Sequence, residues 1–400
     1  MSQAADKANQ RNAVLAGFLG WMLDAFDFFV LTYVINDVAR AFGVDRPAIA
    51  LTLTLAMMMR PIGAIIFGLM ADRYGRRLPL MINVCFFALL SVLSGLAPNY
   101  TTFLVLRMLF GAAMGGEWGV GASLALESAP AKWRGVISGL LQEGYAAGNL
   151  LAAIAYRTVY PTLGWRWMFF VGGLPALLAI FIRFKVKESD AWHEHKTDWP
   201  TYKKALFSHR RLFGYLVVLM TSMMFVSHGT QDLYPTFLQQ ERLFTPRQTA
   251  DIAMITMVGA ILGGIIFGYV SDRIGRKKTM IGAMGLCLLA MPMWIFAPST
   301  PLLIVGGFLM QFGVQGAWGI VPAHLNELAP GMLRGFFPGF AYQLGAMFSA
   351  SITYIEALVG EHFTYSQAMG IIAGTAFVLS AIMIKIGPEN HRVSFRKDGT

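Results

Sequence analysis

Twelve stretches of the chain are each apolar for about twenty residues, and this feature restricts the possible folds most strongly. In lipid, backbone amides must be hydrogen-bonded within the protein, so stretches of this length form spanning helices. Charged residues make up only 14% of the 400 residues, too few for a soluble protein of this size. The sequence therefore predicts an all-α membrane protein with twelve transmembrane helices. The stretches are 12–35, 48–70, 79–97, 101–125, 136–159, 165–184, 211–238, 248–270, 279–297, 301–323, 336–358 and 365–387.

The lysines and arginines are distributed unequally between the two sides of the predicted membrane. With a cytoplasmic N-terminus, 24 of the 32 lie on the cytoplasmic side, six lie outside, and Arg60 and Arg107 lie within spans. This positive-inside pattern predicts a multi-pass protein of the cell membrane with both termini cytoplasmic. It explains the net charge of +10 without a nucleic-acid partner. The first apolar stretch is too long and too acidic for a cleaved signal peptide, so we expect the N-terminus to be retained.

The second half of the sequence repeats the first at an offset of 200 residues. GLMADRYGRR at Gly68–Arg77 returns as GYVSDRIGRK at Gly268–Lys277. We therefore expect two pseudo-symmetric six-helix bundles, residues 1–184 and 211–400, joined by a polar cytoplasmic linker at 185–210. Parallel repeats of this kind are the architecture of alternating-access transporters. Other identical pairs at this offset include Gly63 and Gly263, Trp118 and Trp318, Glu127 and Glu327, and Arg134 and Arg334.

The repeated loop G-x-x-x-D-R-x-G-R-[RK] resembles the cytoplasmic signature of the major facilitator superfamily. The resemblance implies the major facilitator fold. The residues suit a gate, because Asp72 and Asp272 can face helix N-termini and arginines across the interface between the halves. Gly75 and Gly275 would permit tight turns.

Acidic and basic residues at the ends of the fourth, fifth, tenth and eleventh spans can strengthen this gate. We expect ion pairs between Glu127 and Arg134, and between Glu327 and Arg334, that break when the inward side opens. Solvated charges that only anchor the topology are the alternative. The predicted gate residues are Asp72, Arg76, Glu127, Arg134, Asp272, Arg276, Glu327 and Arg334.

Ionisable residues within spans that have no charged counterpart 200 positions away are candidates for the ligand site. Asp24 and Asp27 lie three residues apart on one helical face, and two adjacent carboxylates in a low dielectric cannot easily both ionise. They are natural proton carriers, with a fixed pairing to Arg60 or Arg107 as the alternative. Arg107 opens R-M-L-F-G-A-A-M-G-G, which resembles the superfamily's span-4 motif and implies a proton-transfer or structural role.

Three further carboxylates are placed nearer the membrane faces. For Glu117, Glu143 and Glu356 the sequence favours solvated or helix-pairing roles over chemistry.

Span 7 carries a polar face at S-H-G-T-Q-D-L-Y-P-T, residues 227–236. Ser227, His228, Gln231 and Asp232 share one side of the helix, and His228 and Asp232 at i and i+4 can share a proton. Packing alone does not explain so many polar groups on one stripe, so we interpret the face as functional.

These residues resemble the signature N-x-x-[ST]-H-x-[ST]-Q-D-x-x-x-T of the Jen-type lactate/pyruvate–proton symporters, with Met224 in place of the leading Asn. L-D-A-F-D-F-F at 23–29, L-Q-E-G-Y-A-A-G at 141–148 and A-Y-Q-L-G at 341–345 resemble that family's spans 1, 5 and 11. The resemblance implies symport of a short monocarboxylate with a proton. The proton gradient would be the driving force, with no cofactor or metal, and we expect a functional monomer.

The expected substrate site combines one cation with hydrogen-bonding groups from both halves. Arg60, near the midplane, can hold a carboxylate bidentately, and Arg107 is the second choice. Gln343 with Gln231 and His228 would hold the remaining oxygens. The expected substrate-contacting residues are Arg60, Tyr145, Ser227, His228, Gln231 and Gln343; the expected proton-coupling residues are Asp24, Asp27, Arg107 and Asp232.

Other functions remain open at this stage. A sialate–proton symporter is the nearest rival, although the 26-residue linker has no room for the extra spans typical of that group. Other organic acids are possible substrates. A non-transporting nutrient sensor would need a signalling appendage, and the tail after Gly387 is short. Neither H-E-x-x-H nor G-x-S-x-G occurs, so an enzyme is not expected. Cys85 and Cys287 are too few for a disulfide framework or a cysteine metal site.

Overall fold

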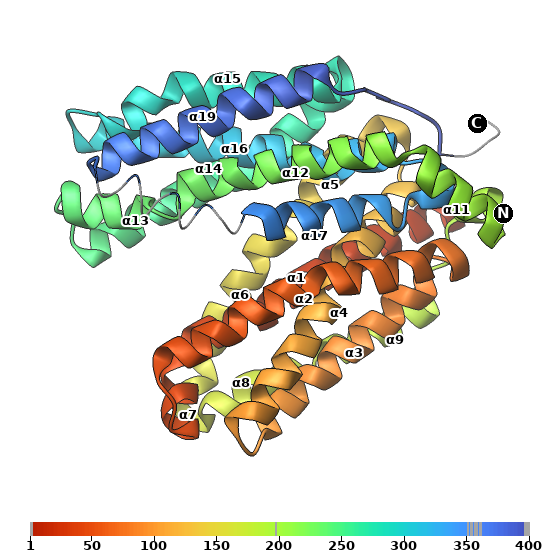
Figure 1. Ribbon diagram of the computed structural model, residues 1–400, viewed down its shortest axis with the longest axis horizontal. Helices are drawn as coiled ribbons and strands as arrows, with labels where there is room; N and C mark the ends of the chain where they lie inside the picture. The colour runs from red at the N-terminus through yellow and green to blue at the C-terminus, as the bar shows by residue number, and fades with distance from the viewer. Residues whose placement is uncertain are drawn as a thin grey trace.

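The computed structural model describes residues 3–196, 198–349, 352, 355, 359 and 362–395, and the described part is helical with no strand. Figure 1 shows two groups of helices, one from each half of the chain. The first half contains α1 (Gln3–Phe42), α2 (Arg46–Tyr74), α3 (Arg77–Leu96), α4 (Tyr100–Ser128), α5 (Arg134–Gln142), α6 (Gly144–Thr158), α7 (Tyr160–Leu163), α8 (Trp165–Val171) and α9 (Pro175–Lys185). The linker holds α10 (Asp190–His195) and α11 (Trp199–Ser208). The second half contains α12 (Arg210–Gln231), α13 (Tyr234–Thr236), α14 (Pro246–Ile274), α15 (Arg276–Ile295), α16 (Thr300–Leu328), α17 (Phe337–Ser349) and α19 (Tyr365–Ile386).

The sequence repeat is visible in the helix bounds. The helices α2 and α14 both have 29 residues, and their ends differ in number by 200. The 29-residue helices α4 and α16 show the same relation, and the 20-residue helices α3 and α15 are offset by 199. The turns that end α2 and α14 lie at Gly75 and Gly275, with φ of 100° and 103°. Only glycine adopts such values without strain, so the same turn is encoded twice.

Ten helices within the described ranges are long and apolar enough to cross a membrane. The predicted span 136–159 is divided into α5 and α6 near Glu143. The predicted span 336–358 is described as α17 up to Ser349, and most of the residues that follow, including Glu356, lie outside the described residues.

Small residues bring α2 and α4 into close contact. A Cβ atom on Gly63 would lie 1.5 Å from the carbonyl oxygen of Ala112, and one on Gly115 would lie 1.8 Å from that of Arg60. Such contacts are typical of helix pairs in membranes, where close backbone approach replaces the hydrophobic driving force. These contacts fix the position of Arg60 along the axis of α4.

The halves are joined at one end of the molecule. There, α5 packs against α14 and α16, and α17 packs against α2 and α4. Figure 1 shows the halves together at the end that carries both termini and α11, and apart toward α7 and α13. If the termini are cytoplasmic, as the charge distribution predicts, the molecule is closed to the cytoplasm and faces outward.

Candidate functional site

At the closed end, each repeated aspartate accepts backbone hydrogen bonds from the opposite half. Asp72 Oδ1 accepts from the backbone N–H of Gly335 at 2.7 Å. The Asp272 carboxylate accepts from the N–H groups of Gly135 at 2.8 Å and Val136 at 3.2 Å. N–H groups near a helix start have no partner within the helix, so a carboxylate is well placed there. Each aspartate therefore faces the start of a helix across the interface, whereas the expected arginine partner across the interface is wrong, because Arg76 and Arg276 pair with the aspartate of their own half.

The ion pairs at this end cross between the halves. Arg134 contacts Glu327 at 3.1 Å, and Arg334 contacts Glu127 at 3.5 Å. The expected pairing of Glu127 with Arg134 and of Glu327 with Arg334 within each half is therefore wrong. The reason is geometric, because the segments that carry Arg134 and Arg334 pack against the opposite half. Opening this end would separate both pairs.

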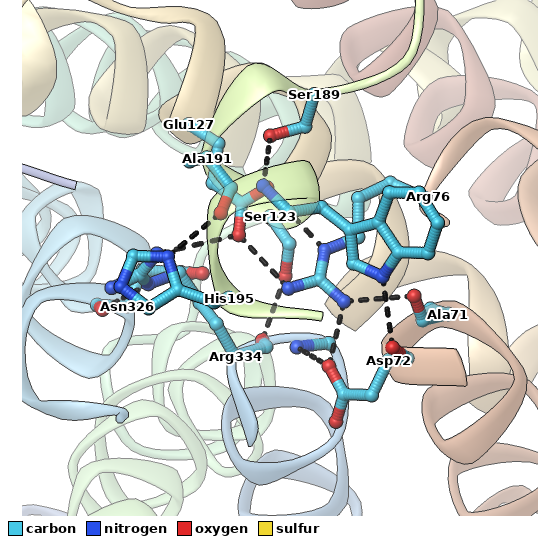
Figure 2. A network of polar contacts seen from close by, with 12 residues as sticks. Ala71, Asp72, Arg76, Ser123, Glu127, Ser189, Ala191, His195, Asn326 and Arg334 are labelled. Carbon is cyan, nitrogen blue, oxygen red and sulfur yellow. Dashed lines mark hydrogen bonds and ion pairs between the residues drawn. The ribbon is translucent and has the colours of Figure 1, made fainter. Parts of the chain in front are cut away.

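A second arginine in each half completes the network. Arg76 lies 2.6 Å from Asp72 and 3.0 Å from Glu127, and Figure 2 shows this group around the Arg76 guanidinium. Arg276 makes the equivalent contacts with Asp272 at 2.8 Å and Glu327 at 2.9 Å. Each glutamate is thus shared between arginines of both halves.

Burial and ion pairing act in opposite directions on these arginines. Burial would lower the pKa of Arg76, but Glu127 and Asp72 outweigh it, and the pKa is raised. Burial lowers the pKa of Arg334 to about 10, although Glu127 opposes the shift. Both side chains are therefore cationic at neutral pH, and the Arg334 pair would be lost only as the pH rises through about 10.

The linker covers the gate loop of the first half. The indole N–H of Trp192 donates to the backbone oxygen of Asp72 at 2.8 Å, and the Tyr202 hydroxyl donates to Asp72 Oδ2 at 3.0 Å. Burial and the neighbouring Asp72 carboxylate both raise the pKa of Tyr202, so the hydroxyl stays protonated and keeps donating.

The segment after α19 covers the gate of the second half. Arg392 donates to the backbone oxygen of Asp272, and Arg134 donates to that of Val393 at 3.0 Å. The Phe395 ring is only 3% exposed. It lies between two guanidinium groups, 3.6 Å from that of Arg134 and 3.9 Å from that of Arg334. One aromatic ring therefore contacts a gate arginine from each half.

Deeper in the first half, Asp27 and Arg107 form a fixed ion pair. Both terminal nitrogens of Arg107 donate to Asp27 Oδ2 at 3.0 Å, and Ser91 donates to the other carboxylate oxygen. The Arg107 guanidinium also lies 4.1 Å from the ring centre of Phe110. The sequence left Asp27 either as a proton carrier or as a fixed partner of Arg60 or Arg107. The geometry corresponds to a fixed pair with Arg107.

Arg60 has no such partner. Its guanidinium donates a hydrogen bond to the Met114 sulfur at 3.3 Å and lies 5.5 Å from the centre of the Phe28 ring. Its Nε has no hydrogen-bond acceptor, and no carboxylate lies within ion-pair distance of it among the described residues. Arg60 lines a small cavity between α1, α2 and α4 together with Arg107. It is a buried cation whose charge no bonded carboxylate neutralises.

Aromatic side chains from both halves gather around Tyr342 on α17. Trp118 stacks on Tyr342 with ring centres 4.3 Å apart, and Trp318 and Trp21 meet it edge-on at 6.1 and 6.4 Å. Tyr145 stacks on Trp21 at 5.5 Å and keeps an exposed side. Sequence reasoning missed most of this cluster, because ligand-site residues were sought among positions that do not repeat, and Trp118 and Trp318 repeat at the offset of 200. Their recurrence as large aromatics beside glycines was the available signal.

Several polar atoms near this cluster are buried without partners. The indole nitrogens of Trp21 and Trp318 have no acceptor within the described part of the chain, and Gln343 Oε1 has no donor. Gln343 itself reaches across the interface, where its amide donates to the Gly115 backbone oxygen at 3.5 Å. Arg60, Asp24 and Tyr145 all lie within electrostatic range of Tyr342.

The polar face of span 7 lies on the opposite half, on α12. His228 Nδ1 and Asp232 Oδ2 are 2.9 Å apart, and both side chains are more than a third exposed. Gln231 donates to Gln311 on α16 at 3.2 Å, a partner that the sequence pattern did not indicate. Ser227 is half-buried on the same helix. These groups line the second half, away from the Arg60 cavity in the first.

Glu117 is placed differently from the expectation. It lies in the middle of α4 with 0% exposure, and neither carboxylate oxygen has a hydrogen-bond partner within the described residues. The expected solvated role is therefore wrong for this residue, because α4 packs into the centre of its bundle against α1 and α2. Glu143, at the junction of α5 and α6, is half-buried near Gly264 of α14.

Comparison with known proteins gives consistent relatives over most of the chain. A yeast protein described as a carboxylic acid transporter protein homolog, from Saccharomyces cerevisiae, is 30% identical over 95% of this chain and 68% of its own. The sialic acid transporter NanX of Escherichia coli is 28% identical over 97% of each chain. In fold, the chain is similar to the structure of the proton:xylose symporter XylE, with a TM-score of 0.77 over 97% of this chain and 98% of that one at 20% identity.

The family model for sugar (and other) transporters matches residues 12–211 and again residues 207–388. Each match covers one half of the repeat, and together they span nearly the whole chain. The chain belongs to the sugar (and other) transporter family of the major facilitator superfamily, and is a membrane transporter rather than an enzyme.

Proposed function

We propose that this transporter carries a small organic-acid anion together with a proton, and that a short monocarboxylate such as lactate or pyruvate is its substrate. The observation that carries the proposal is Arg60, a buried guanidinium with a free Nε and no carboxylate bonded to it within the described residues. An isolated buried charge is costly, so a site of this kind favours a ligand of opposite sign.

The neighbouring groups support an anionic ligand of small size. A carboxylate on Arg60 would accept from two parallel N–H groups, the strongest geometry available to an arginine. The unpartnered indole N–H groups of Trp21 and Trp318 would supply further donors. Gln343, whose side chain reaches from the second half to the first, would then change its contacts when the site is filled.

Three further observations favour a carboxylate and proton coupling. The span-7 residues that resemble the lactate/pyruvate–proton symporters bring a titratable imidazole within 2.9 Å of Asp232. Asp24 and Glu117 add buried carboxylates on the Arg60 side. The yeast relative is described as a carboxylic acid transporter homolog.

Sialic acid symport is the second candidate. The clustered rings of Trp21, Trp118 and Tyr342 offer flat apolar faces of the kind that cover a sugar ring, and NanX is similar to this chain over 97% of each chain. A substrate with a ring would use these faces, whereas lactate would leave most of them without contact.

Counterflow in proteoliposomes distinguishes these substrates. Vesicles loaded with one unlabelled compound are diluted into its labelled form, with lactate, pyruvate, acetate, muconate, sialate and the neutral sugar xylose tested in turn. The proposal expects transient accumulation of lactate or pyruvate and none of the neutral sugar xylose. Accumulation of sialate alone would favour the second candidate. Counterflow of xylose without any acid would overturn both.

A further inference from the structure

Two carboxylates in the first half are buried without any hydrogen bond. Asp24 on α1 and Glu117 on α4 both have 0% exposure, and all four of their carboxylate oxygens lack a partner within the described residues. Asp27, one turn along α1, differs completely, because Arg107 and Ser91 satisfy both of its oxygens. The adjacent aspartates of span 1 therefore have separate roles.

Asp24 and Glu117 are neighbours across the α1–α4 contact. Gly20 lies one helical turn before Asp24, and a Cβ atom there would lie 2.0 Å from Glu117 Oε1. The Glu117 side chain thus occupies the space that Gly20 leaves on α1. Asp24 is the charged group that acts electrostatically on Glu117. Two carboxylates this close in a low dielectric cannot both be ionised.

Within the described residues, the groups that face this pair include a single cation. Arg60 on α2 acts on Asp24, and so does Asp27, whose charge is already balanced by Arg107. The hydroxyls of Tyr145 on α6 and Tyr342 on α17 are the remaining titratable neighbours. One negative charge on the pair would balance Arg60, and a second would be uncompensated.

We propose that Asp24 and Glu117 form the proton-carrying pair of this transporter, taking up one proton when the substrate anion reaches Arg60. The inference rests on the proposed function. With the site empty, the pair holds one proton and one negative charge, which balances Arg60. The anion then replaces that charge, and a second proton enters the pair. When the anion leaves on the other side, this proton leaves with it. Charge in the buried site is conserved at each step, and one proton moves per anion.

Asp232 is the other candidate for carrying the proton, and its surroundings differ from those of the Asp24–Glu117 pair. Asp232 is bonded to His228 and is 38% exposed, so water can stabilise its charge without the substrate. The Asp24–Glu117 pair has no such screening, so its protonation depends on the charge at Arg60. This dependence is the property that couples two fluxes.

The test compares counterflow with accumulation in proteoliposomes, using labelled lactate. For a monoanion carried with one proton, each unit of inward pH gradient supports at most about tenfold accumulation. Glu117→Gln and Asp24→Asn should each reduce accumulation to near the equilibrium level while leaving counterflow within about threefold of the parent. Asp37→Asn, which removes a half-buried carboxylate of the same helix that pairs with Arg40, should change neither.

A further pair of measurements keeps the test decisive if a variant folds poorly. Glu117→Asp retains a carboxyl group and should recover gradient-driven accumulation. In infrared difference spectra, lactate binding should increase the C=O band of a protonated carboxyl group, and this change should be absent in both Glu117→Gln and Asp24→Asn.

The outcomes separate this inference from the proposed function. If the parent itself shows neither lactate counterflow nor gradient-driven uptake, the proposed function fails. If the parent is driven by the proton gradient and Glu117→Gln still accumulates lactate normally, the pair is not the proton carrier. Loss of accumulation in Asp232→Asn alone, with both pair variants unaffected, would move the proton to span 7.

Discussion

Arg60 is the residue on which the proposed substrate site depends most directly. Arg60→Lys keeps the positive charge but removes the planar fork and the free Nε, so a carboxylate would lose bidentate binding. We expect the affinity for the transported acid to fall at least about tenfold, as measured by binding in detergent. Arg40→Lys, an exposed arginine that pairs with Asp37, is the matched control and should have no effect. Unchanged affinity in Arg60→Lys and Arg60→Ala would place the anion elsewhere.

The ion pair of Asp27 and Arg107 makes a different residue-scale prediction. Asp27→Asn would leave a buried guanidinium without a carboxylate, and breaking such a pair typically costs about 3–5 kcal/mol. We expect a lower thermal unfolding temperature in detergent than for Asp24→Asn, which removes a carboxylate with no hydrogen bond. Equal stability of the two variants would show that Asp27 is not a structural partner of Arg107.

Individual residues were predictable from the sequence only where their chemistry is unusual. Arg60 and Arg107 stood out as charges in apolar spans without a repeated counterpart, and so did Asp24 and Asp27. Glu117 was recognised as a charge, but its burial depends on how α4 packs against α1, which helical periodicity does not determine. The cluster around Tyr342 joins residues from four helices, and no local pattern connects them.

At the scale of structural elements, the segment after α19 makes a prediction about the closed end. Phe395→Ala would remove the ring that contacts both Arg134 and Arg334, and should therefore favour opening of this end. Ser138 is a suitable reporter of opening, because it is fully buried where α5 contacts α16. In a background without Cys85 and Cys287, we expect maleimide to label Ser138→Cys severalfold faster when Phe395→Ala is added.

Val393→Ala is the matched control for this experiment. It truncates a neighbouring side chain but keeps the backbone oxygen that accepts from Arg134. Its labelling rate should equal that of the parent. Equal rates for all three proteins would show that the Phe395 ring does not stabilise the closed end.

Element bounds followed from the sequence more closely than element contacts did. The repeat at an offset of 200 is reproduced in the equal lengths of α2 and α14, and of α4 and α16. The pairing of Arg134 with Glu327 rather than with Glu127 depends on which half each loop packs against. The sequence describes each half separately, so it carried no direct signal for contacts between them.

At the scale of the whole molecule, the two bundles meet at one end only, and this arrangement fits one state of an alternating-access cycle (Figure 1). The crossed pairs of Arg134 and Arg334 hold that end together without titrating near neutral pH. Because burial brings the pKa of Arg334 only to about 10, the pH dependence of transport below pH 9 should arise from the buried carboxylates instead. A pH profile of counterflow that is unchanged in Arg334→Lys would agree with this assignment, and a shifted acidic limb would not.

We propose above that an organic anion and a proton cross the membrane together. The most direct test of this coupling records labelled lactate uptake and internal pH at the same time, in proteoliposomes with an inward proton gradient and no sodium. We predict uptake accompanied by entry of about one proton per lactate, and loss of accumulation when a protonophore is added. Lactate uptake that requires sodium and persists with the protonophore, with no proton entry, would show that the anion is not carried with a proton.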